Sequence, residues 1–373
     1  MSSTIAVDVG SLVGRPTGVG RFTAELLTAL AARPDAPTVL RYVLSARAAL
    51  PPDVRRLPYP ARAALKAWGR TDHPRARRAL RGADVVHGTN FVAPPTGWPT
   101  VITVHDCSPL THPERVHPVV RDFVPVLRRA VARGAWVHTP STHVAGQVAD
   151  LLGTARVRAI PHGAPAPLPA GIASVPLPAE LAGALGHAPY VLAVGTLEPR
   201  KNLPTLVRAF AHVAASDDQV RLVLAGPPGS DQGAVDAAIA ALAVPVRARV
   251  VVTGWVDEAV RQRLLAGARV LAYPSLDEGF GLPMLEAFGA GVPVVAARAG
   301  SLPEVAGDAA VLVPPTDADA LADALVAVLH DDARHAVLVA AGTARLPRYD
   351  WAATAAAMVE LYREAIADGG STR

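Results

Sequence analysis

The sequence predicts an α/β protein made of two doubly wound, Rossmann-like domains that face each other across a cleft. Three observations predict this architecture. Short β-branched runs alternate with helical stretches in two separate series, which is the pattern of parallel sheets built from βαβ units. A stretch rich in proline, alanine and glycine at 161–171 separates the two series and is typical of an interdomain connection. The 373 residues, 51% of them hydrophobic, are enough for two domains that each bury a core.

The first predicted domain spans residues 1–172. Its expected strands are Ile5–Val9, Leu40–Leu44, Asp84–His87, Val101–His105, Ala135–His138 and Val157–Ile160. An amphipathic helical pattern closes the chain at Trp351–Ala367. We expect this C-terminal segment, about 351–373, to pack back onto the first domain.

The second predicted domain spans residues 186–350. Its expected strands are Tyr190–Val194, Arg221–Ala225, Val250–Thr253, Val270–Tyr273, Pro293–Ala296 and Ala310–Val313. Helical patterns such as Leu203–Ala214 and Asp319–Leu329 separate these strands. In open sheets of this kind, ligands bind beyond the carboxyl ends of the strands.

The charge is unevenly distributed, although the net charge is only +4. Residues 1–170 hold 21 Lys and Arg against 10 Asp and Glu, and the remaining residues hold 15 against 22. The densest basic segment contains Arg55, Arg56, Arg62, Lys66, Arg70, Arg75, Arg77, Arg78 and Arg81. Two interpretations stay open for it: a solvated face, or a surface that meets a phosphate-rich acceptor or an anionic membrane. A nucleic-acid partner is not expected, because no binding motif accompanies the segment.

The expected compartment is the cytoplasm. The single cysteine, Cys107, excludes an internal disulfide and a cysteine-based zinc site, and it agrees with a reducing environment. The sequence has no run of eighteen apolar residues, and the segment Met1–Asp8 lacks the pattern of a secretory signal.

Two glutamates eight residues apart, Glu278 and Glu286, bracket a Gly-x-Gly turn. The turn follows an expected strand and precedes a short expected helix, so free backbone N–H groups at the helix start can receive a diphosphate. Gly279 and Gly281 let a ligand approach the backbone. We expect Glu278 at the mouth of this site and Glu286 about two turns into the helix, which we expect to lie at the surface. Each carboxylate can accept hydrogen bonds from vicinal hydroxyls, one from the transferred sugar and the other from the ribose. The alternative is a pair of ordinary acids near a helix N-terminus.

Two further glycine corners follow expected strands. The first, Gly14 to Arg21, contains Gly18 and Gly20 but lacks the spacing of a dinucleotide fingerprint, which disfavours a dehydrogenase. The second, Gly195 to Asn202, places Arg200 and Lys201 where a leaving diphosphate needs neutralising. Lys201 is one of only two lysines in an arginine-rich chain, which indicates a requirement for a compact charge. The alternative is a loop cation without a ligand.

The chain resembles family 4 glycosyltransferases of the GT-B fold. In the sequence of residues 195–202 it is similar to bacterial mannosyltransferase-like members of that family. The resemblance spans nearly the whole chain. Its landmarks are the Glu-x7-Glu element at Glu278 and Glu286, the loop cations Arg200 and Lys201, the glycine loop at Gly18 and Gly20, and the His-Asp pair at His105 and Asp106. The chain departs from the family at Thr196, where many members carry an arginine, and Arg200 is the candidate to supply that charge.

The resemblance implies a retaining hexosyltransferase that uses a nucleoside-diphosphate sugar as a substrate and requires no metal or other cofactor. The implied catalytic residues are His105, Arg200, Lys201 and Glu278. The implied donor-binding residues are Gly18, Gly20, Thr196, Gly254, Trp255, Val256, Gly279, Phe280, Gly281, Leu282 and Glu286. The only Asp-x-Asp pair, Asp317 and Asp319, lies at an expected helix start, where capping rather than metal binding is expected.

The branch that the chain resembles favours GDP-mannose as donor, with the second domain binding the donor and the first the acceptor. A glycan, a lipid-linked glycan at the membrane surface and a natural product stay open as acceptors. Two other functions also stay open: a GT-B sugar-nucleotide epimerase and a non-catalytic nucleotide-sugar-binding scaffold. The composition, rich in alanine, proline and arginine and poor in lysine, is typical of a high-GC bacterial source.

Overall fold

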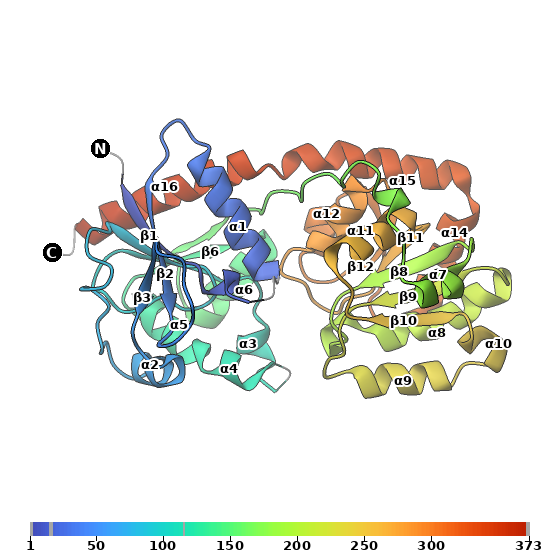
Figure 1. Ribbon diagram of the computed structural model, residues 1–373, viewed down its shortest axis with the longest axis horizontal. Coiled ribbons are helices and arrows are strands. Elements are labelled where there is room, and N and C mark those ends of the chain that lie inside the picture. Colours follow the sequence, from blue (N-terminus) through green and yellow to red (C-terminus); the bar gives the residue numbers. More distant parts are fainter. Residues whose placement is uncertain (1–2, 15–17, 115, 371–373) are drawn as a thin grey trace. The chain divides into compact units, whose positions relative to one another are not determined.

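The computed structural model describes residues 3–14, 18–114 and 116–370. It contains two compact units, residues 1–163 with 349–373 and residues 164–348 (Figure 1). Each unit has one sheet in which every strand pair is parallel. Each sheet is flanked by helices, as the alternating sequence pattern predicts.

Unit 1 has a seven-stranded sheet of order β3-β2-β1-β4-β5-β6-β7. The strands are β1 (Thr4–Asp8), β2 (Thr38–Leu44), β3 (Val54–Leu57), β4 (Val85–Gly88), β5 (Thr100–Thr103), β6 (Trp136–Thr139) and β7 (Val157–Ala159). The helices are α1 (Gly18–Ala31), α2 (Ala61–Trp68), α3 (Ser108–Thr111), α4 (Pro118–Arg121), α5 (Phe123–Ala132), α6 (Thr142–Leu152) and α16 (Trp351–Gly370), with the 3-10 turn η1 (Gly10–Leu12).

Unit 2 has a six-stranded sheet of order β10-β9-β8-β11-β12-β13. The strands are β8 (Tyr190–Val194), β9 (Arg221–Ala225), β10 (Val250–Gly254), β11 (Val270–Tyr273), β12 (Val294–Ala297) and β13 (Ala310–Val313). The helices are α7 (Ala179–Leu185), α8 (Leu203–Ser216), α9 (Gln232–Ala240), α10 (Val244–Arg247), α11 (Glu258–Gly267), α12 (Leu282–Gly289), α13 (Leu302–Ala306), α14 (Ala318–His330) and α15 (Asp332–Arg345). Short 3-10 turns are η2 (Ile172–Ser174), η3 (Pro199–Lys201) and η4 (Leu346–Arg348).

Strand β3 is the one strand of the first sheet that the sequence reading missed. Its residues, Val-Arg-Arg-Leu, form a short edge strand that pairs only with β2, so a charged pattern is compatible with it. The guanidinium of Arg55 donates to the carbonyls of Ala79 and Arg81, and that of Arg56 donates to Ser45 and Ala48. These two arginines of the basic segment therefore brace loops of unit 1.

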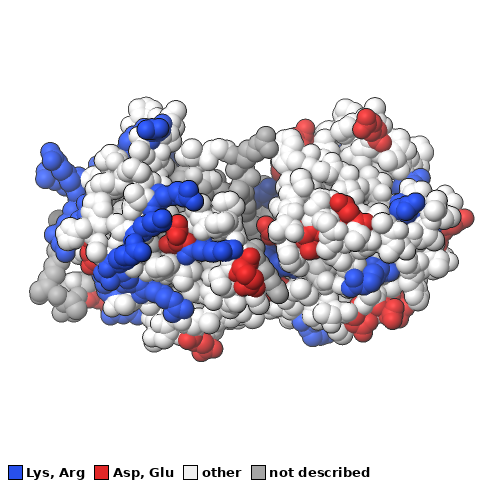
Figure 2. Space-filling model, turned by 90° about the horizontal axis from the view of Figure 1, so that it is seen from below, with Lys and Arg blue, Asp and Glu red and all other residues white. Residues whose placement is uncertain are grey.

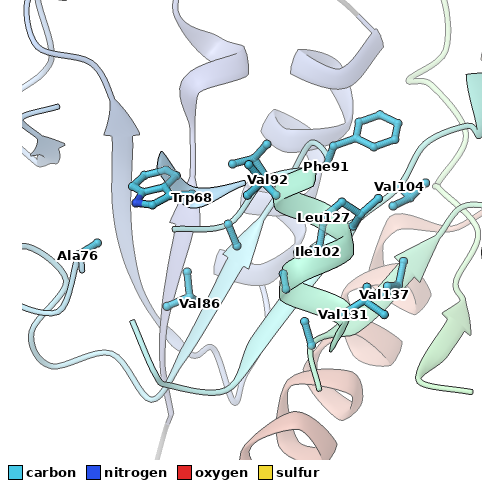
Figure 3. Close-up of a cluster of buried hydrophobic side chains, with 14 of the residues drawn as sticks. Trp68, Ala76, Val86, Phe91, Val92, Ile102, Val104, Leu127, Val131 and Val137 are labelled. Atoms are coloured by element: carbon cyan, nitrogen blue, oxygen red, sulfur yellow. The ribbon is translucent and has the colours of Figure 1, made fainter. Parts of the chain in front are cut away.

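The core of unit 1 lies on both faces of its sheet. Figure 3 shows the cluster on one face, in which Trp68 of α2 and Leu127 of α5 lie over Val86, Ile102 and other strand residues. A second cluster joins strand residues to α1 and the C-terminal helix α16. In Figure 1, α16 runs along the unit 1 sheet beside α1. The apolar face of this last helix therefore completes the core of the unit that contains the N-terminus.

A buried chain of hydrogen bonds also attaches α16 to the sheet. The Tyr362 hydroxyl lies 2.8 Å from His87 Nδ1, His87 Nε2 lies 2.8 Å from Thr103 Oγ1, and Thr103 Oγ1 lies 2.9 Å from His138 Nδ1. His138 Nε2 lies 3.0 Å from the Ile160 carbonyl, which can only accept. Every proton position follows from that end: His138 and His87 each carry the proton on Nε2, and Thr103 and Tyr362 donate. Burial lowers the pKa of both imidazoles, that of His138 to about 4, so both are neutral at pH 7.

Candidate donor site in unit 2

The strand order of unit 2 reverses between β8 and β11, which are neighbours in the sheet but not in sequence. Such a switch point is where open α/β sheets bind ligands, because the loops that leave the two strands diverge there. The loop after β8 carries the cations Arg200 and Lys201. The loop after β11 carries Glu278. The topology thus brings together two motifs that lie 77 residues apart.

Glu278 forms ion pairs with both cations. Its Oε2 lies 2.5 Å from Arg200 Nη1, and its Oε1 lies 2.7 Å from Lys201 Nζ. Burial alone would raise the pKa of this carboxyl, but the charges of Arg200 and Lys201 outweigh it and lower the pKa to about 2. Glu278 is therefore an anion at neutral pH. It is also buried, with 8% of its side chain exposed, whereas the sequence reading placed it at the mouth of the site.

The side chain of Lys201 is closely packed. A Cβ on Gly195, whose φ is +140°, would come within 3.1 Å of Lys201 Cε, so the glycine leaves room for the lysine stem. The ammonium lies 4.9 Å from the centre of the Tyr273 ring. Burial lowers the pKa of Lys201, and the neighbouring Glu278 opposes that fall. The cation is held in place by surrounding groups rather than extended into solvent.

Asn202 fastens the cation loop to two other strand ends. Its Nδ2 donates to the carbonyls of Pro274, after β11, and Pro315, after β13, at 3.1 and 2.7 Å. Its Oδ1 accepts from Thr205 at 2.7 Å. Its φ of +54° is in the left-handed region, which asparagine tolerates better than most residues. This side chain sets the position of the two cations that precede it.

The glycine turn after Glu278 has the form that the sequence predicts. Gly281 has φ +102° and precedes the first turn of α12, and Gly279 and Phe280 are buried. Leu282 begins α12. The helix differs from the expected surface helix, because Met284 to Phe288 are all buried. The carboxylate of Glu286 is therefore set in a packed helix, with 8% of its side chain exposed.

Glu286 is bound by an arginine that the sequence reading did not single out. Arg261 of α11 donates from Nη1 to Glu286 Oε2 at 2.6 Å and from Nη2 to Oε1 at 3.1 Å. The same guanidinium also binds Glu258 through Nε at 2.9 Å and Nη2 at 2.7 Å. No local motif could have identified this contact, since Arg261 and Glu286 lie on different helices.

The remaining expected donor residues of unit 2 lie at the same edge of the sheet. Gly254 ends β10 with φ +65°, and it is followed by Trp255, which is 57% exposed, and half-buried Val256. Thr196 lies in the loop after β8, half-buried, with its methyl 2.9 Å from where a Cβ of Gly229 would lie. Their contacts with a donor stay predictions.

The capping role predicted for Asp317 is confirmed. Its Oδ1 accepts from the Ala320 backbone N–H at 2.9 Å, at the N-terminus of α14. Within residues 3–14, 18–114 and 116–370, no group of three or more His, Cys, Asp or Glu side chains is placed to hold a metal ion. No helix in these ranges is both long and apolar enough to cross a bilayer.

The expected site residues of unit 1 lie at the switch point of its own sheet, between β1 and β4. His105 follows β5, and its Nε2 lies 2.9 Å from the carbonyl of Thr89, just after β4. Because a carbonyl only accepts, Nε2 carries the proton and Nδ1 is left as an acceptor. Burial lowers the pKa of His105, so the imidazole is neutral at pH 7. Gly18 and Gly20 lie in the first turn of α1, and residues 15–17 of that glycine loop lie outside the described residues.

Comparisons with known proteins agree with this fold and identify its family. Residues 188–331 match the family described as "Glycosyl transferases group 1", and residues 16–166 match "Glycosyltransferase Family 4". An O-antigen chain mannosyltransferase B of Escherichia coli is 32% identical over 289 residues, which are 75% of this chain and 74% of the relative. A phosphatidyl-myo-inositol mannosyltransferase of Mycobacterium leprae is 35% identical over 52% of this chain and 50% of its own length.

Solved structures show the same GT-B fold. Sucrose-phosphate synthase from Thermosynechococcus elongatus has a TM-score of 0.73 at 23% identity, covering 98% of this chain and 100% of that one. WaaG, a glycosyltransferase involved in lipopolysaccharide biosynthesis, has a TM-score of 0.67 at 16% identity, covering 96% of this chain and 99% of that one. At these identities the likeness speaks for the fold alone.

Proposed function

Because this chain belongs to glycosyltransferase family 4, we propose that it transfers a hexose from a nucleoside-diphosphate sugar to an acceptor hydroxyl, with retention of configuration and without a required metal ion. The observation that carries the proposal is the cluster of Arg200, Lys201 and Glu278 at the switch point of unit 2. A second carboxylate, Glu198, lies 4.0 Å from Arg200 Nη2, but 45% of its side chain is exposed. Water therefore screens its charge more than that of Glu278, and the two less exposed cations can still attract an incoming anion. A leaving diphosphate is the anion that such a reaction must stabilise.

The two loop cations act on the leaving group. Breaking the bond between the sugar C1 and the phosphate oxygen puts negative charge on the diphosphate, and fixed cations stabilise that charge without reorganising. Lys201 is held by Tyr273 and Gly195, and Arg200 donates to the Asp277 carbonyl at 3.0 Å. Both charges are thus positioned before the reaction begins. Arg200 takes the role that many family members give to an arginine at the position of Thr196.

The two glutamates accept hydrogen bonds from hydroxyl groups of the donor. Glu278 is ionised, with a pKa of about 2, so it cannot supply a proton to the reaction at neutral pH. In the proposal its carboxylate accepts hydrogen bonds from hydroxyls of the transferred sugar, while Glu286 accepts them from the ribose hydroxyls. His105 contributes an unprotonated Nδ1, which accepts a hydrogen bond from a sugar hydroxyl.

The proposed transfer needs no side chain as a base, because the leaving diphosphate takes the proton of the acceptor hydroxyl. The bond from C1 to the leaving phosphate oxygen breaks while the bond from C1 to the acceptor oxygen forms on the same face of the sugar. The acceptor proton passes to an oxygen of the departing diphosphate, which gains the negative charge needed to take it. The role of the protein in this step is to hold and neutralise the diphosphate.

GDP-mannose is the proposed donor, and a glycan, a glycolipid or a natural product supplies the acceptor hydroxyl. The names of two relatives support mannose: one is an O-antigen chain mannosyltransferase and one a phosphatidyl-myo-inositol mannosyltransferase. The same names mention an O-antigen chain and a phosphatidyl-myo-inositol, which supports a glycan or a lipid as the acceptor. We place the activity in the cytoplasm, with unit 1 binding the acceptor.

We also propose a peripheral contact of unit 1 with an anionic membrane. Figure 2 shows a band of Lys and Arg over the part of the molecule formed by unit 1, on the face that carries α2. The exposed cations of this segment include Arg62, Lys66, Arg70, Arg77 and Arg78. Each basic side chain near an anionic surface contributes about 1 kcal/mol. Sedimentation with phosphatidylglycerol vesicles tests this contact, and equal binding to neutral phosphatidylcholine vesicles would contradict it.

Calorimetry and thermal shift with GDP, UDP, ADP and dTDP, and with their sugar conjugates, test the donor class without knowledge of the acceptor. We expect one nucleotide, GDP, to stabilise the protein equally in EDTA and in Mg²⁺. Binding that requires Mg²⁺ would contradict metal independence, and no binding by the whole panel would contradict the proposed function. Product analysis separates the alternatives: an epimerase releases a changed nucleotide sugar, and a scaffold binds the donor without turnover.

A further inference from the structure

The carboxylate of Glu286 is fixed by a neighbouring helix. Both of its oxygens accept from the terminal nitrogens of Arg261, at 2.6 and 3.1 Å. Only 8% of the Glu286 side chain and 17% of the Arg261 side chain are exposed. A planar guanidinium that binds both carboxylate oxygens fixes the plane of the carboxylate as well as its position.

A second carboxylate holds the guanidinium. Glu258, three residues earlier on α11, accepts from Arg261 Nε at 2.9 Å and from Nη2 at 2.7 Å. All three nitrogens of Arg261 are thereby engaged. Burial would lower the pKa of Arg261, but its hydrogen bonds and charge interactions with Glu258 and Glu286 outweigh burial and raise it. Arg261 is therefore a permanent, oriented cation between two helices.

The arginine connects two parts of the donor site. Helix α11 begins at Glu258, directly after the loop of Gly254 to Val256, and Glu286 lies on the helix that follows the glycine turn. Each carboxylate oxygen has two lone pairs, so an oxygen bound to Arg261 can still accept a hydroxyl. Because Arg261 fixes the plane of the Glu286 carboxylate, the remaining lone pairs point in a fixed direction.

We propose that Arg261 is a positioning residue for the nucleoside part of the donor, which holds Glu286 so that its carboxylate receives the two ribose hydroxyls. This inference rests on the proposed function, in which Glu286 binds the ribose. Arg261 has no part in the bond-breaking step. Its loss weakens nucleotide binding and ribose selectivity, and it leaves the turnover of bound donor nearly unchanged.

The test compares GDP with 2′-deoxy-GDP by calorimetry on the full chain, with the UDP or ADP pairs if GDP does not bind. A hydrogen bond to a charged group predicts that the wild type prefers the ribonucleotide by roughly 10- to 100-fold. Arg261→Met should reduce that preference to about threefold or less, and Arg261→Lys should show an intermediate preference. Arg247→Met, at an exposed position of α10, is the matched control and should keep the wild-type preference.

The outcomes distinguish this inference from the proposed function. If no nucleoside diphosphate binds the wild type, both are overturned. If the wild type binds without ribose preference, or if Arg261→Met keeps the full preference, the positioning role of Arg261 is overturned and the proposed function stands. If Arg261→Met does not fold, the ribose preference of Arg261→Lys is the test, because lysine keeps the charge but cannot bind both carboxylate oxygens in the planar geometry of a guanidinium. A fall in kcat of more than tenfold in that variant, at saturating donor, would also contradict a positioning role.

Discussion

Removing the ammonium of Lys201 perturbs the proposed leaving-group site most directly. In Lys201→Ala, Glu278 loses the partner 2.7 Å from its Oε1 and keeps Arg200, 2.5 Å from its Oε2. The lysine is 12% exposed, so water does not replace its charge fully. The variant should therefore keep a paired glutamate and a folded unit 2, while the diphosphate loses one fixed cation.

The expected loss of turnover is about 100- to 1,000-fold, the effect of removing one preorganised stabilising group. Loss of a buried hydrogen bond to a charged partner should lower the free energy of unfolding by about 1–3 kcal/mol. Nucleotide affinity should fall less than turnover, because the charge on the diphosphate grows as the sugar leaves.

The assay measures GDP release from GDP-mannose in EDTA, with the same reaction on Arg247→Ala as control. Lys201→Arg should recover little, since the space beside Gly195 is fitted to a linear stem. Turnover of Lys201→Ala within threefold of the wild type would refute this reasoning and transfer the role to Arg200.

Three further predictions concern the fold that supports the site. Asn202→Ala should lower the free energy of unfolding in urea by about 2 kcal/mol, because the carbonyls of Pro274 and Pro315 lose their donor. Asn202→Gly should lower it less, since glycine adopts the positive φ of this position more easily than alanine does. An equal loss in the two variants would contradict a contribution from the positive φ. Gly163→Ala should destabilise unit 1 by about 1–3 kcal/mol, because its Cβ would lie 2.3 Å from Trp351 Cγ, whereas Gly146→Ala, with open space around it, should be neutral or stabilising in the same melts. The stability difference between wild type and His138→Gln should be largest above pH 6.5 and should shrink by about 1.6 kcal/mol between pH 6.5 and 5. The unfolded imidazole gains a proton in this range, whereas the folded one, with a pKa of about 4, stays mostly neutral. A difference independent of pH would contradict the neutral state of this buried imidazole.

The sequence was sufficient to predict most of the architecture. β-branched runs such as Tyr190–Val194 and Val270–Tyr273 predicted buried parallel strands, and the structure has β8 and β11 at these residues. Glycine corners after those strands then located the two loops of the switch point. Strand β3 was missed because two of its four residues are arginines, and an edge strand shows no apolar alternation.

The side-chain partnerships could not be predicted from the sequence, because they depend on which strand ends become neighbours. Glu278 was expected at the mouth of the site, and strand order buries it against Arg200 and Lys201. The contact of Arg261 with Glu286 joins two helices, and the relay from Tyr362 to His138 crosses three strands and a helix. No spacing rule for a single helix or strand contains these contacts.

The most direct test of the central claim is a ¹H NMR time course of donor hydrolysis, with GDP-mannose, water as the acceptor and EDTA present. Observation within the first minutes, before mutarotation, identifies the anomer that is formed first. We predict α-mannose and GDP in equal amounts, as a retaining and metal-independent transfer requires. First formation of β-mannose would contradict retention, and a new nucleotide sugar without GDP release would contradict glycosyl transfer and identify an epimerase.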